Sequence, residues 1–267
     1  MTKIESALCC LSQNRIPLCG ACRFSSELVL PNVRSVSRLP KEPKTLLIGL
    51  FPYYTGRNDE RNLSLYSVIP DYHDVAGAML QKACDSLKAL FPEGNFVSFV
   101  DASPIDEVTA AVRAGLGVRG RNNQLITEKF GSMVFIGEIV TDIDFDVVDS
   151  AEKSCENCGR CVKACPTGAL SENGFDKNRC RSHFSQKKGE LTEWESQQLK
   201  SGGLVWGCDI CTLACPHNSH PQMTPIEEFL SDVVSVADED NLDLLMKNRA
   251  FAWRGEKAMR RNMSLLK

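Results

Sequence analysis

The sequence contains no apolar run of the roughly 20 residues that a membrane-spanning helix needs. Its first twenty residues include Glu5, Asn14 and Arg15 and no long apolar segment, so they do not resemble a secretory signal peptide. No twin-arginine export signal is visible either. We therefore expect a cytoplasmic protein without a membrane segment, and its 43% hydrophobic and 24% charged residues are ordinary for a globular chain of 267 residues.

Cysteine, by contrast, is abundant, with 13 residues in the chain. The first dense run has the spacing C-x2-C-x2-C-x3-C-P, which is typical of bacterial ferredoxins, and it consists of Cys155, Cys158, Cys161, Cys165 and Pro166. Such spacing lets a short loop present three thiolates to one cluster. The proline after the fourth cysteine suits the first turn of a departing helix, because proline needs no N–H partner there.

A lone Cys180 and a second run, C-x2-C-x3-C-P, complete the pattern; the second run consists of Cys208, Cys211, Cys215 and Pro216. In two-cluster ferredoxins the cysteine before the proline serves the other cluster. We therefore predict two 4Fe–4S clusters, one held by Cys155, Cys158, Cys161 and Cys215, and the other by Cys165, Cys180, Cys208 and Cys211. Zinc sites or disulfides are the alternatives, but evenly stepped cysteines followed by Cys-Pro are rare at zinc.

Five cysteines remain outside this pattern: Cys9, Cys10, Cys19, Cys22 and Cys84. Cys19 and Cys22 form a C-x2-C pair, which suits a redox pair or half of a metal site. Because no second pair lies nearby, we favour the simpler interpretation that these thiols are small buried hydrophobes.

The hydrophobic pattern predicts three strands and two helices before the cysteine region, with residues 55–64 as a polar loop. Apolar runs at 44–54, 95–100 and 132–141 are typical of strands, and the spacing of apolar residues over 75–90 fits an amphipathic helix. A short helix is expected over 107–114, a linker over 142–153, and further helical segments near 191–199 and within 217–246.

Two polar residues lie at the ends of these elements. Asp101 follows the second predicted strand, where it is placed to act as a general acid or base; the alternative is that Asp101 or Ser103 caps the next helix. His73 precedes the helix over 75–90, and it is either a site residue or an ordinary polar residue of the first turn.

Residues 115–120 match the dinucleotide pattern G-x-G-x-x-G, but a helix and not a strand is expected before them. We interpret them as a glycine-rich loop whose backbone approaches another group closely. Residues 247–267 carry seven basic residues and one acidic residue, with Phe251 and Trp253 between them. This segment is either a phosphate-binding surface or a solvated helix face.

The order of these motifs resembles the epoxyqueuosine reductase family. The resemblance covers residues 44–262 and rests on the following ordered motifs: Asp71-Tyr72-His73, Val100-Asp101-x-x-Pro104, the stretch Ala114 to Asn122, Gly131-Ser132-x-x-Phe135-Ile136-Gly137-Glu138, Trp206-Gly207-Cys208-Asp209-Ile210-Cys211, Cys215-Pro216-His217-Asn218, Phe251-Ala252-Trp253-Arg254-Gly255 and Arg260-Arg261-Asn262.

The resemblance implies an α+β fold, with a nitroreductase-related cobalamin-binding domain over 1–146 and a ferredoxin-like domain with two 4Fe–4S clusters over 147–230; a basic helical tail over 231–267 completes the chain. It implies reduction of epoxyqueuosine to queuosine in tRNA, with Asp101 as proton donor and electrons from a low-potential donor such as ferredoxin or flavodoxin. The cobalamin contacts that it implies are His73, Gly115, Gly117, Gly120, Arg121, Asn122 and Gly137.

The sequence also departs from the family. Ile69-Pro70 stands where the family usually has Arg-Gly, and we expect the family's C-terminal helical-repeat extension, which helps to hold tRNA, to be absent. Two other functions therefore remain open. One is a corrinoid iron–sulfur reductase of another substrate, such as an organohalide, since the family is similar in architecture to reductive dehalogenases. The other is a non-enzymatic carrier of electrons.

Overall fold

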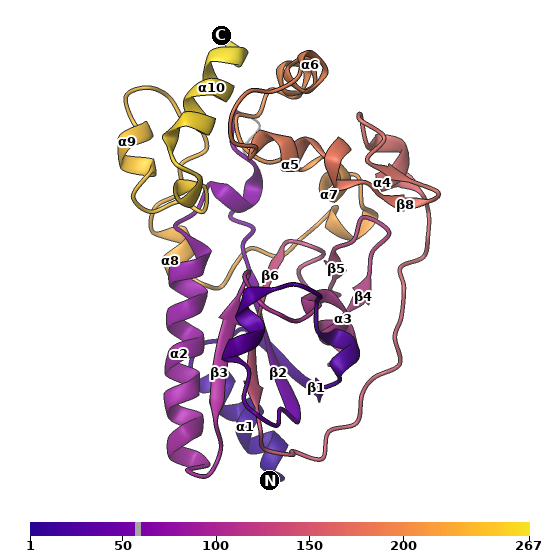
Figure 1. The fold of residues 1–267 in the computed structure, drawn as a ribbon, viewed down its shortest axis with the longest axis vertical. Helices are drawn as coiled ribbons and strands as arrows, with labels where there is room; N and C mark the ends of the chain where they lie inside the picture. The colour runs from indigo at the N-terminus through magenta and orange to yellow at the C-terminus, as the bar shows by residue number, and fades with distance from the viewer. Residues whose placement is uncertain (57–59) are drawn as a thin grey trace. The chain divides into compact units, whose positions relative to one another are not determined.

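The computed structural model describes residues 1–56 and 60–267, and the packing of the chain divides it into two units. The first unit comprises residues 1–52 and 73–155, and the second comprises 53–72 and 156–267 (Figure 1). Residues 57–59 of the predicted polar loop lie outside the described residues. The division at 146 and 230 was inferred from the family resemblance, and it stays a prediction.

A four-stranded antiparallel sheet forms the centre of the first unit. Its strand order is β1 (Leu18–Arg23), β2 (Thr45–Pro52), β6 (Val134–Thr141) and β3 (Phe96–Val100). All eight residues of β2 are buried, as the continuous apolar sequence of this strand predicts for a strand covered on both faces.

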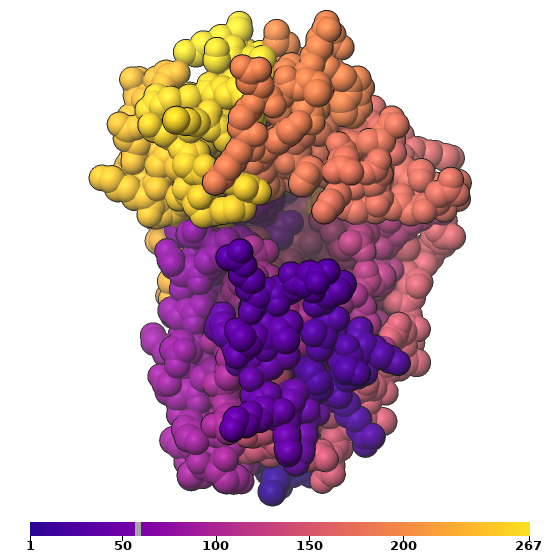
Figure 2. Space-filling model, viewed as in Figure 1, coloured from indigo at the N-terminus to yellow at the C-terminus, as the bar shows by residue number. Residues whose placement is uncertain are grey.

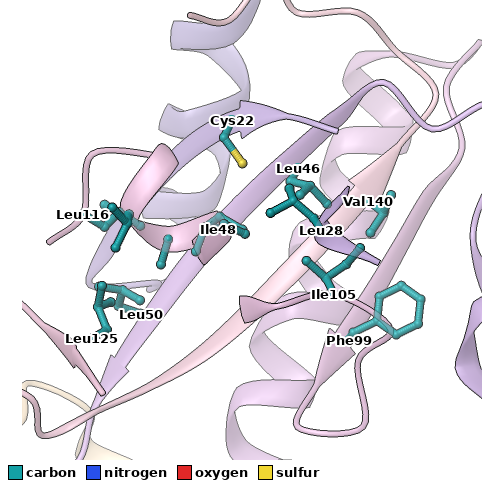
Figure 3. Close-up of a cluster of buried hydrophobic side chains, with 13 residues drawn as sticks. Cys22, Leu28, Leu46, Ile48, Leu50, Phe99, Ile105, Leu116, Leu125 and Val140 are labelled. Atoms are coloured by element: carbon teal, nitrogen blue, oxygen red, sulfur yellow. The ribbon is translucent and has the colours of Figure 1, made fainter. Parts of the chain in front are cut away.

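Helices pack on the sheet and give it two cores. The unit contains α1 (Lys3–Gln13), α2 (Tyr72–Leu90) and α3 (Glu107–Arg113). On one face, side chains of β2 pack with those of α3 and its flanking loops; the labelled members of this core in Figure 3 include Leu46, Ile48, Leu50, Ile105 and Leu116. On the other face Leu80 of α2 lies against Gly137 of β6, where an added Cβ would lie 2.6 Å from the leucine.

The three predicted strands and both predicted helices of this unit are present, and their ends differ from the prediction by at most three residues. The glycine-rich loop leads from α3 into a short hairpin, β4 (Val118–Arg119) and β5 (Leu125–Ile126), so it is not a dinucleotide-binding turn. The predicted linker has no helix or strand, but it packs along the unit, with Ile143, Phe145 and Val147 buried. Helix α1 and strand β1 were not foreseen, because cysteines obscure the hydrophobic pattern of residues 1–30.

The second unit is built of short helices and turns. Its α-helices are α4 (Arg160–Ala164), α5 (Arg181–Ser185), α6 (Glu193–Gly202), α7 (Ile210–Leu213), α8 (Glu227–Leu230), α9 (Leu242–Leu245) and α10 (Glu256–Leu266), and its two-stranded sheet pairs β7 (Leu170–Ser171) with β8 (Gly174–Phe175). The helices predicted near 191–199 and within 217–246 correspond to α6, α8 and α9.

The C-terminal segment belongs to the core of this unit. Helix α10 packs against α6, and Figure 2 shows the yellow C-terminal residues beside the orange ones. The rings of Trp206 and Phe251 lie 5.6 Å apart, and both side chains are buried. Asn262 of α10 donates hydrogen bonds to the carbonyl oxygens of Ser185 and Val205, at 2.8 and 2.7 Å. The segment is therefore an integral part of the unit.

Over the residues that the structure describes, no helix combines the length and the apolar character that a transmembrane span requires.

Candidate functional site

Cys180 and the cysteines of the second run lie at or near the starts of short helices. Cys180 is the N-cap of α5, Cys211 lies in α7, and Cys215 is the N-cap of the 3₁₀ turn Pro216–Asn218, whose first residue is the proline. The helical departure predicted after a Cys-Pro pair therefore occurs here. It does not occur after Cys165, where the chain turns through Gly168, with φ of +64°, and enters β7.

The four cysteines predicted to hold the second cluster lie together in the second unit. Burial, together with the neighbouring Cys208, Cys180 and Cys165, raises the pKa of Cys211 to about 12. Burial likewise raises the pKa of Cys208, and Cys180 contributes to that rise. Thiols with a raised pKa stay protonated at neutral pH, and they ionise only where a bound cation offsets the charge, as the iron of a cluster does.

Cys165 differs from the other three because the protein stabilises its thiolate. Burial opposes ionisation, but N–H groups of Leu170, Thr167 and Ala169 and the hydroxyl of Thr167 donate to the sulfur, so that the pKa of Cys165 lies below its ordinary value. Hydrogen bonds of this kind to a ligating sulfur also tune the potential of a cluster.

The other predicted set is divided along the chain. Cys155 closes the first unit, whereas Cys158, Cys161 and Cys215 belong to the second, where α4 packs against α7. Cys155 is well fixed in its own unit: its N–H donates to the carbonyl of Arg119 at 3.0 Å, and its sulfur accepts the N–H of Arg121 at 3.4 Å. The assembly of this set stays a prediction from the motif.

All thirteen cysteines are described, and all are free thiols. Within residues 1–56 and 60–267 no group of three or more His, Cys, Asp or Glu side chains is arranged to hold a single metal ion.

The predicted acid and one predicted cofactor contact form a pair in the first unit. Nε2 of His73, in the first turn of α2, lies 3.3 Å from Oδ2 of Asp101, which directly follows β3. The side chains are 32% and 61% exposed, so the pair is open to solvent in its unit. Asp101 has φ of +60°, a left-handed conformation that asparagine and aspartate adopt more readily than most residues.

Asp101 does not cap the following helix, and neither does Ser103. The N-cap of α3 is Asp106, whose carboxylate accepts the N–H of Thr109 at 3.1 Å and is held by the guanidinium of Arg119 at 2.8 Å. The structural alternative for Asp101 is therefore wrong, and the side chain of Asp101 is left for another role.

The glycines of the predicted cofactor loop lie close to other parts of their own unit. A Cβ on Gly117 would collide with the carbonyl of Ile126, and one on Gly120 would collide with the side chain of Asn122. Gly115 has φ of +76° and lies against Ser150. The hairpin itself, together with neighbouring segments, is thus the group that the backbone approaches closely.

The remaining predicted contacts of this loop also have partners inside the unit. Asn122 is buried and donates to Oε1 of Gln124 at 2.6 Å, while the N–H of Arg121 is directed at Cys155. Gly137 makes room for Leu80, as described above. Packing therefore accounts for each of these residues, and their contact with a corrinoid stays a prediction.

Two acidic residues that the sequence analysis did not name as site residues lie in the interior of the first unit, close to the turn that carries Asp101. Glu138 of β6 is fully buried, and its burial raises its pKa to about 8 although Ser103 donates a hydrogen bond to it. Burial also raises the pKa of Glu107, and the charges of Glu138, Asp101 and Asp106 add to that rise. An acidic residue inside an otherwise apolar strand, as in residues 134–141, was the available signal.

Part of the positive charge of the C-terminal segment is neutralised within the second unit. Arg260 pairs with Glu239, Asp243 and Glu256, while the buried Arg249 pairs with Asp232. Arg261 donates to the carbonyl oxygens of Lys187 and Gly189. Trp253, which is 59% exposed, has the guanidinium of Arg254 3.9 Å from its ring. The segment is thus less free to bind phosphates than its composition suggested.

Known proteins account for this combination of a mixed helix–sheet unit and a cysteine-rich unit. Residues 154–218 match the family model of the 4Fe–4S double cluster binding domain. An epoxyqueuosine reductase of Bacillus subtilis is 33% identical over 91% of this chain and 65% of its own length. Another from Lactococcus garvieae is 32% identical over 72% of this chain and 57% of its own length.

The chain is thus related in sequence to the epoxyqueuosine reductases. It spans less than two thirds of the length of these curated relatives.

Solved structures share the fold. An epoxyqueuosine reductase bound to an epoxyqueuosine-modified tRNA-Tyr stem loop superposes with a TM-score of 0.80 at 24% identity, over 98% of this chain and 80% of that one. The Bacillus subtilis enzyme with an aspartate-bearing catalytic loop swung out of its active site gives 0.76 at 23%, over 98% and 80%. A reductive dehalogenase described as B12-dependent gives 0.52 at 17%, over 98% and 35%.

Proposed function

We propose that this chain is a cobalamin- and iron–sulfur-dependent reductase that converts epoxyqueuosine to queuosine in tRNA. The observation that carries the proposal is the exposed pair of His73 and Asp101, the latter in a left-handed conformation, in a chain that also matches a double cluster binding domain. The aspartate-bearing loop of the Bacillus subtilis relative supports it, since that loop is described as catalytic.

The number and spacing of the cysteines support two clusters. Eight cysteines follow the ferredoxin spacing, and four of them, Cys165, Cys180, Cys208 and Cys211, lie close enough together to affect one another's ionisation. For cobalamin the supporting feature is the open polar edge formed by His73 and Asp101, which these residues would present to the corrinoid. When bound, the corrinoid supplies a strongly reducing nucleophile and the clusters supply electrons one at a time.

The chain's own contribution is to provide protons and to fix their position. Removal of the epoxide oxygen as water, leaving an alkene, consumes two electrons and two protons. Asp101 would donate a proton to the departing oxygen, and His73, within 3.3 Å of the same carboxyl, would orient it. By the same resemblance we propose that the first unit is related to nitroreductases, that tRNA is the macromolecular substrate, and that a low-potential ferredoxin or flavodoxin supplies the electrons.

The test is anaerobic reconstitution with iron, sulfide and cobalamin, followed by turnover of a tRNA stem loop that carries epoxyqueuosine. We expect about eight irons and one cobalt per chain, and mass spectrometry of the nucleosides should show queuosine. Eight irons without cobalt and without turnover would favour an electron carrier. Cobalt binding with turnover of halogenated phenols, but not of the stem loop, would favour the organohalide alternative.

A further inference from the structure

Glu138 lies on the face of the sheet that α3 covers. In the registers of β6 with its two neighbours, Glu138 is directly opposite Ile48 of β2 and Phe99 of β3. Residues opposite one another in an antiparallel pair project to the same face. Ile48 and Phe99 belong to the core under α3 (Figure 3), so the carboxyl of Glu138 is surrounded by apolar side chains and faces the helix that carries Glu107.

Each of the two carboxyl groups has one buried oxygen without a hydrogen-bond partner. These are Oε1 of Glu107 and Oε2 of Glu138. The hydroxyl of Ser103 donates to the other oxygen of Glu138, and the N–H of Asp101 donates to Glu107. The charge of Glu138 acts on Glu107, so two ionised carboxylates in this buried place would repel each other, whereas one proton between them removes the repulsion.

These contacts connect the acid pair to the turn that carries Asp101. The turn is tight: the N–H of Ala102 donates to the carbonyl of Val100 at 2.8 Å, and Asp101 itself is left-handed. One end is fixed by Glu107 through the N–H of Asp101. The other end is fixed by Glu138 through Ser103, whose hydroxyl also accepts the N–H of Ile105 at 3.0 Å.

We propose that Glu107 and Glu138 hold a single proton between them and that this acid pair positions the turn that carries Asp101. Loss of that proton places two negative charges side by side. Glu107, the less buried residue of the two, then moves toward solvent and releases the N–H of Asp101. The role in catalysis depends on the proposed function, whereas the shared proton and the state of the turn do not.

The other charged and titratable groups around the pair come from α3, β4, β3 and β1. Asp106 of the α3 cap is held by Arg119 of β4, and Asp101 at the end of β3 adds to the negative potential at Glu107. On β1, Cys22 is buried with a pKa raised to about 12, so it stays neutral across the working range. The residue opposite on β2, Ile48, is apolar. Among the groups named here, we therefore expect the pair of Glu107 and Glu138 to titrate near neutral pH.

Infrared spectroscopy of the cluster-loaded enzyme tests the shared proton. At neutral pH the wild type should show the C=O stretching band of one buried protonated carboxyl, and Glu107→Gln and Glu138→Gln should each abolish it completely, because the glutamine amide takes over the role of the proton. The exposed Glu93 provides the control, and Glu93→Gln should leave the band unchanged. A band that each single variant halves would mean two separate protons and would overturn the proposal, as would the absence of any band that the variants remove.

Hydrogen exchange tests the positioning. After correction for the intrinsic rate, the peptide covering residues 96–106 should lose protection at Asp101 in the wild type as the pH rises, and should keep it in Glu138→Gln. Protection that does not change with pH in the wild type would overturn the positioning role. If a glutamine variant does not fold, Ser103→Ala replaces it: the carboxyl band should shift and Asp101 should lose protection at neutral pH, and an unchanged spectrum and exchange pattern would contradict us.

Activity then separates the two proposals. With a reactive stem loop, turnover by the wild type should fall as the pH rises and the pair loses its proton, whereas Glu138→Gln should keep its turnover over the same range with an unchanged KM. If no epoxyqueuosine is reduced at any pH, the proposed function fails, and the infrared and exchange measurements still decide the acid pair.

Discussion

Nε2 of His73 lies 3.3 Å from Oδ2 of Asp101, although the two residues are 28 positions apart in the chain. Helix α2 provides the histidine in its first turn, and the end of β3 provides the aspartate. Because both side chains are partly exposed, their attraction in the isolated pair contributes little to stability. The pair is better explained by what it presents to a ligand than by what it does for the fold.

We expect Asp101→Asn to lower turnover of the epoxyqueuosine stem loop by about 10²–10⁴-fold, since a positioned acid contributes about that much. Iron and cobalt content should not change, because Asp101 is in neither predicted cluster set. Steady-state kinetics and metal analysis provide the check. Asp85→Asn, an exposed aspartate in the middle of α2, is the matched control and should retain full activity. A fully active Asp101→Asn enzyme would remove the residue from its proposed role.

Cys211→Ser should lower the iron content from about eight to about four atoms per chain. Cys211 lies among Cys165, Cys180 and Cys208, so its loss leaves one cluster without its fourth thiolate. Iron analysis and electron paramagnetic resonance of the reduced protein would show one cluster signal in place of two. The exposed Cys9, changed to serine, should leave both clusters intact. Full iron content in Cys211→Ser would contradict the assignment.

The free energy of unfolding should fall as the pH rises from about 4.5 to about 8. Burial raises the pKa of Glu138 from 4.5 to about 8, so over this range the native state keeps a proton that the unfolded state has released. One such group changes the stability by at most about 1.4 kcal/mol per pH unit. Denaturant titrations at a series of pH values measure this slope, which should be smaller in Glu138→Gln than in the wild type and unchanged in Glu93→Gln.

Replacement of the α3 cap separates the hydrogen bonds of Asp106 from its charge. Asp106→Ala should cost about 0.5–2 kcal/mol of stability, as expected for the loss of an N-cap. Burial opposes ionisation of Asp106, but Thr109 and Arg119 outweigh it and lower its pKa, so its contribution is present above its ordinary pKa of 3.8 and is lost as the pH falls further. Asp106→Asn keeps a good cap and should show a smaller loss of stability, without this acid dependence. Equal losses in both variants would show that the charge matters more than the cap.

Regular patterns made much of the first unit predictable. The apolar run of β2 and the apolar spacing of α2 are local signals, and both elements form as expected. The eight cluster cysteines were predictable because ferredoxin spacing is itself a local pattern. Helix α1 was missed although it begins with a complete capping box of Thr2 and Glu5, which a search for caps would have found.

What could not be predicted depends on register and on packing between distant elements. Glu138 faces α3 because of its pairing with Ile48 and Phe99, and a shift of one residue would turn it to the other face. The neutralisation of Arg260 depends on Glu239 and Asp243, about twenty residues earlier, and composition does not reveal such pairing. The close approach of Gly117 to Ile126 likewise requires the hairpin to be known.

Arg119 serves two neighbours at once. Its backbone forms hydrogen bonds with the segment that ends at Cys155, and its guanidinium forms an ion pair with Asp106 at the start of α3. A substitution of Arg119 should therefore have two effects. Loss of the guanidinium should weaken the start of α3, next to the turn that carries Asp101, and it should disturb strand β4, to which the backbone of Cys155 is hydrogen-bonded. A genetic screen scored separately for iron content and for substrate turnover should return changes at this position in both classes, whereas changes at Asp101 should appear only in the second.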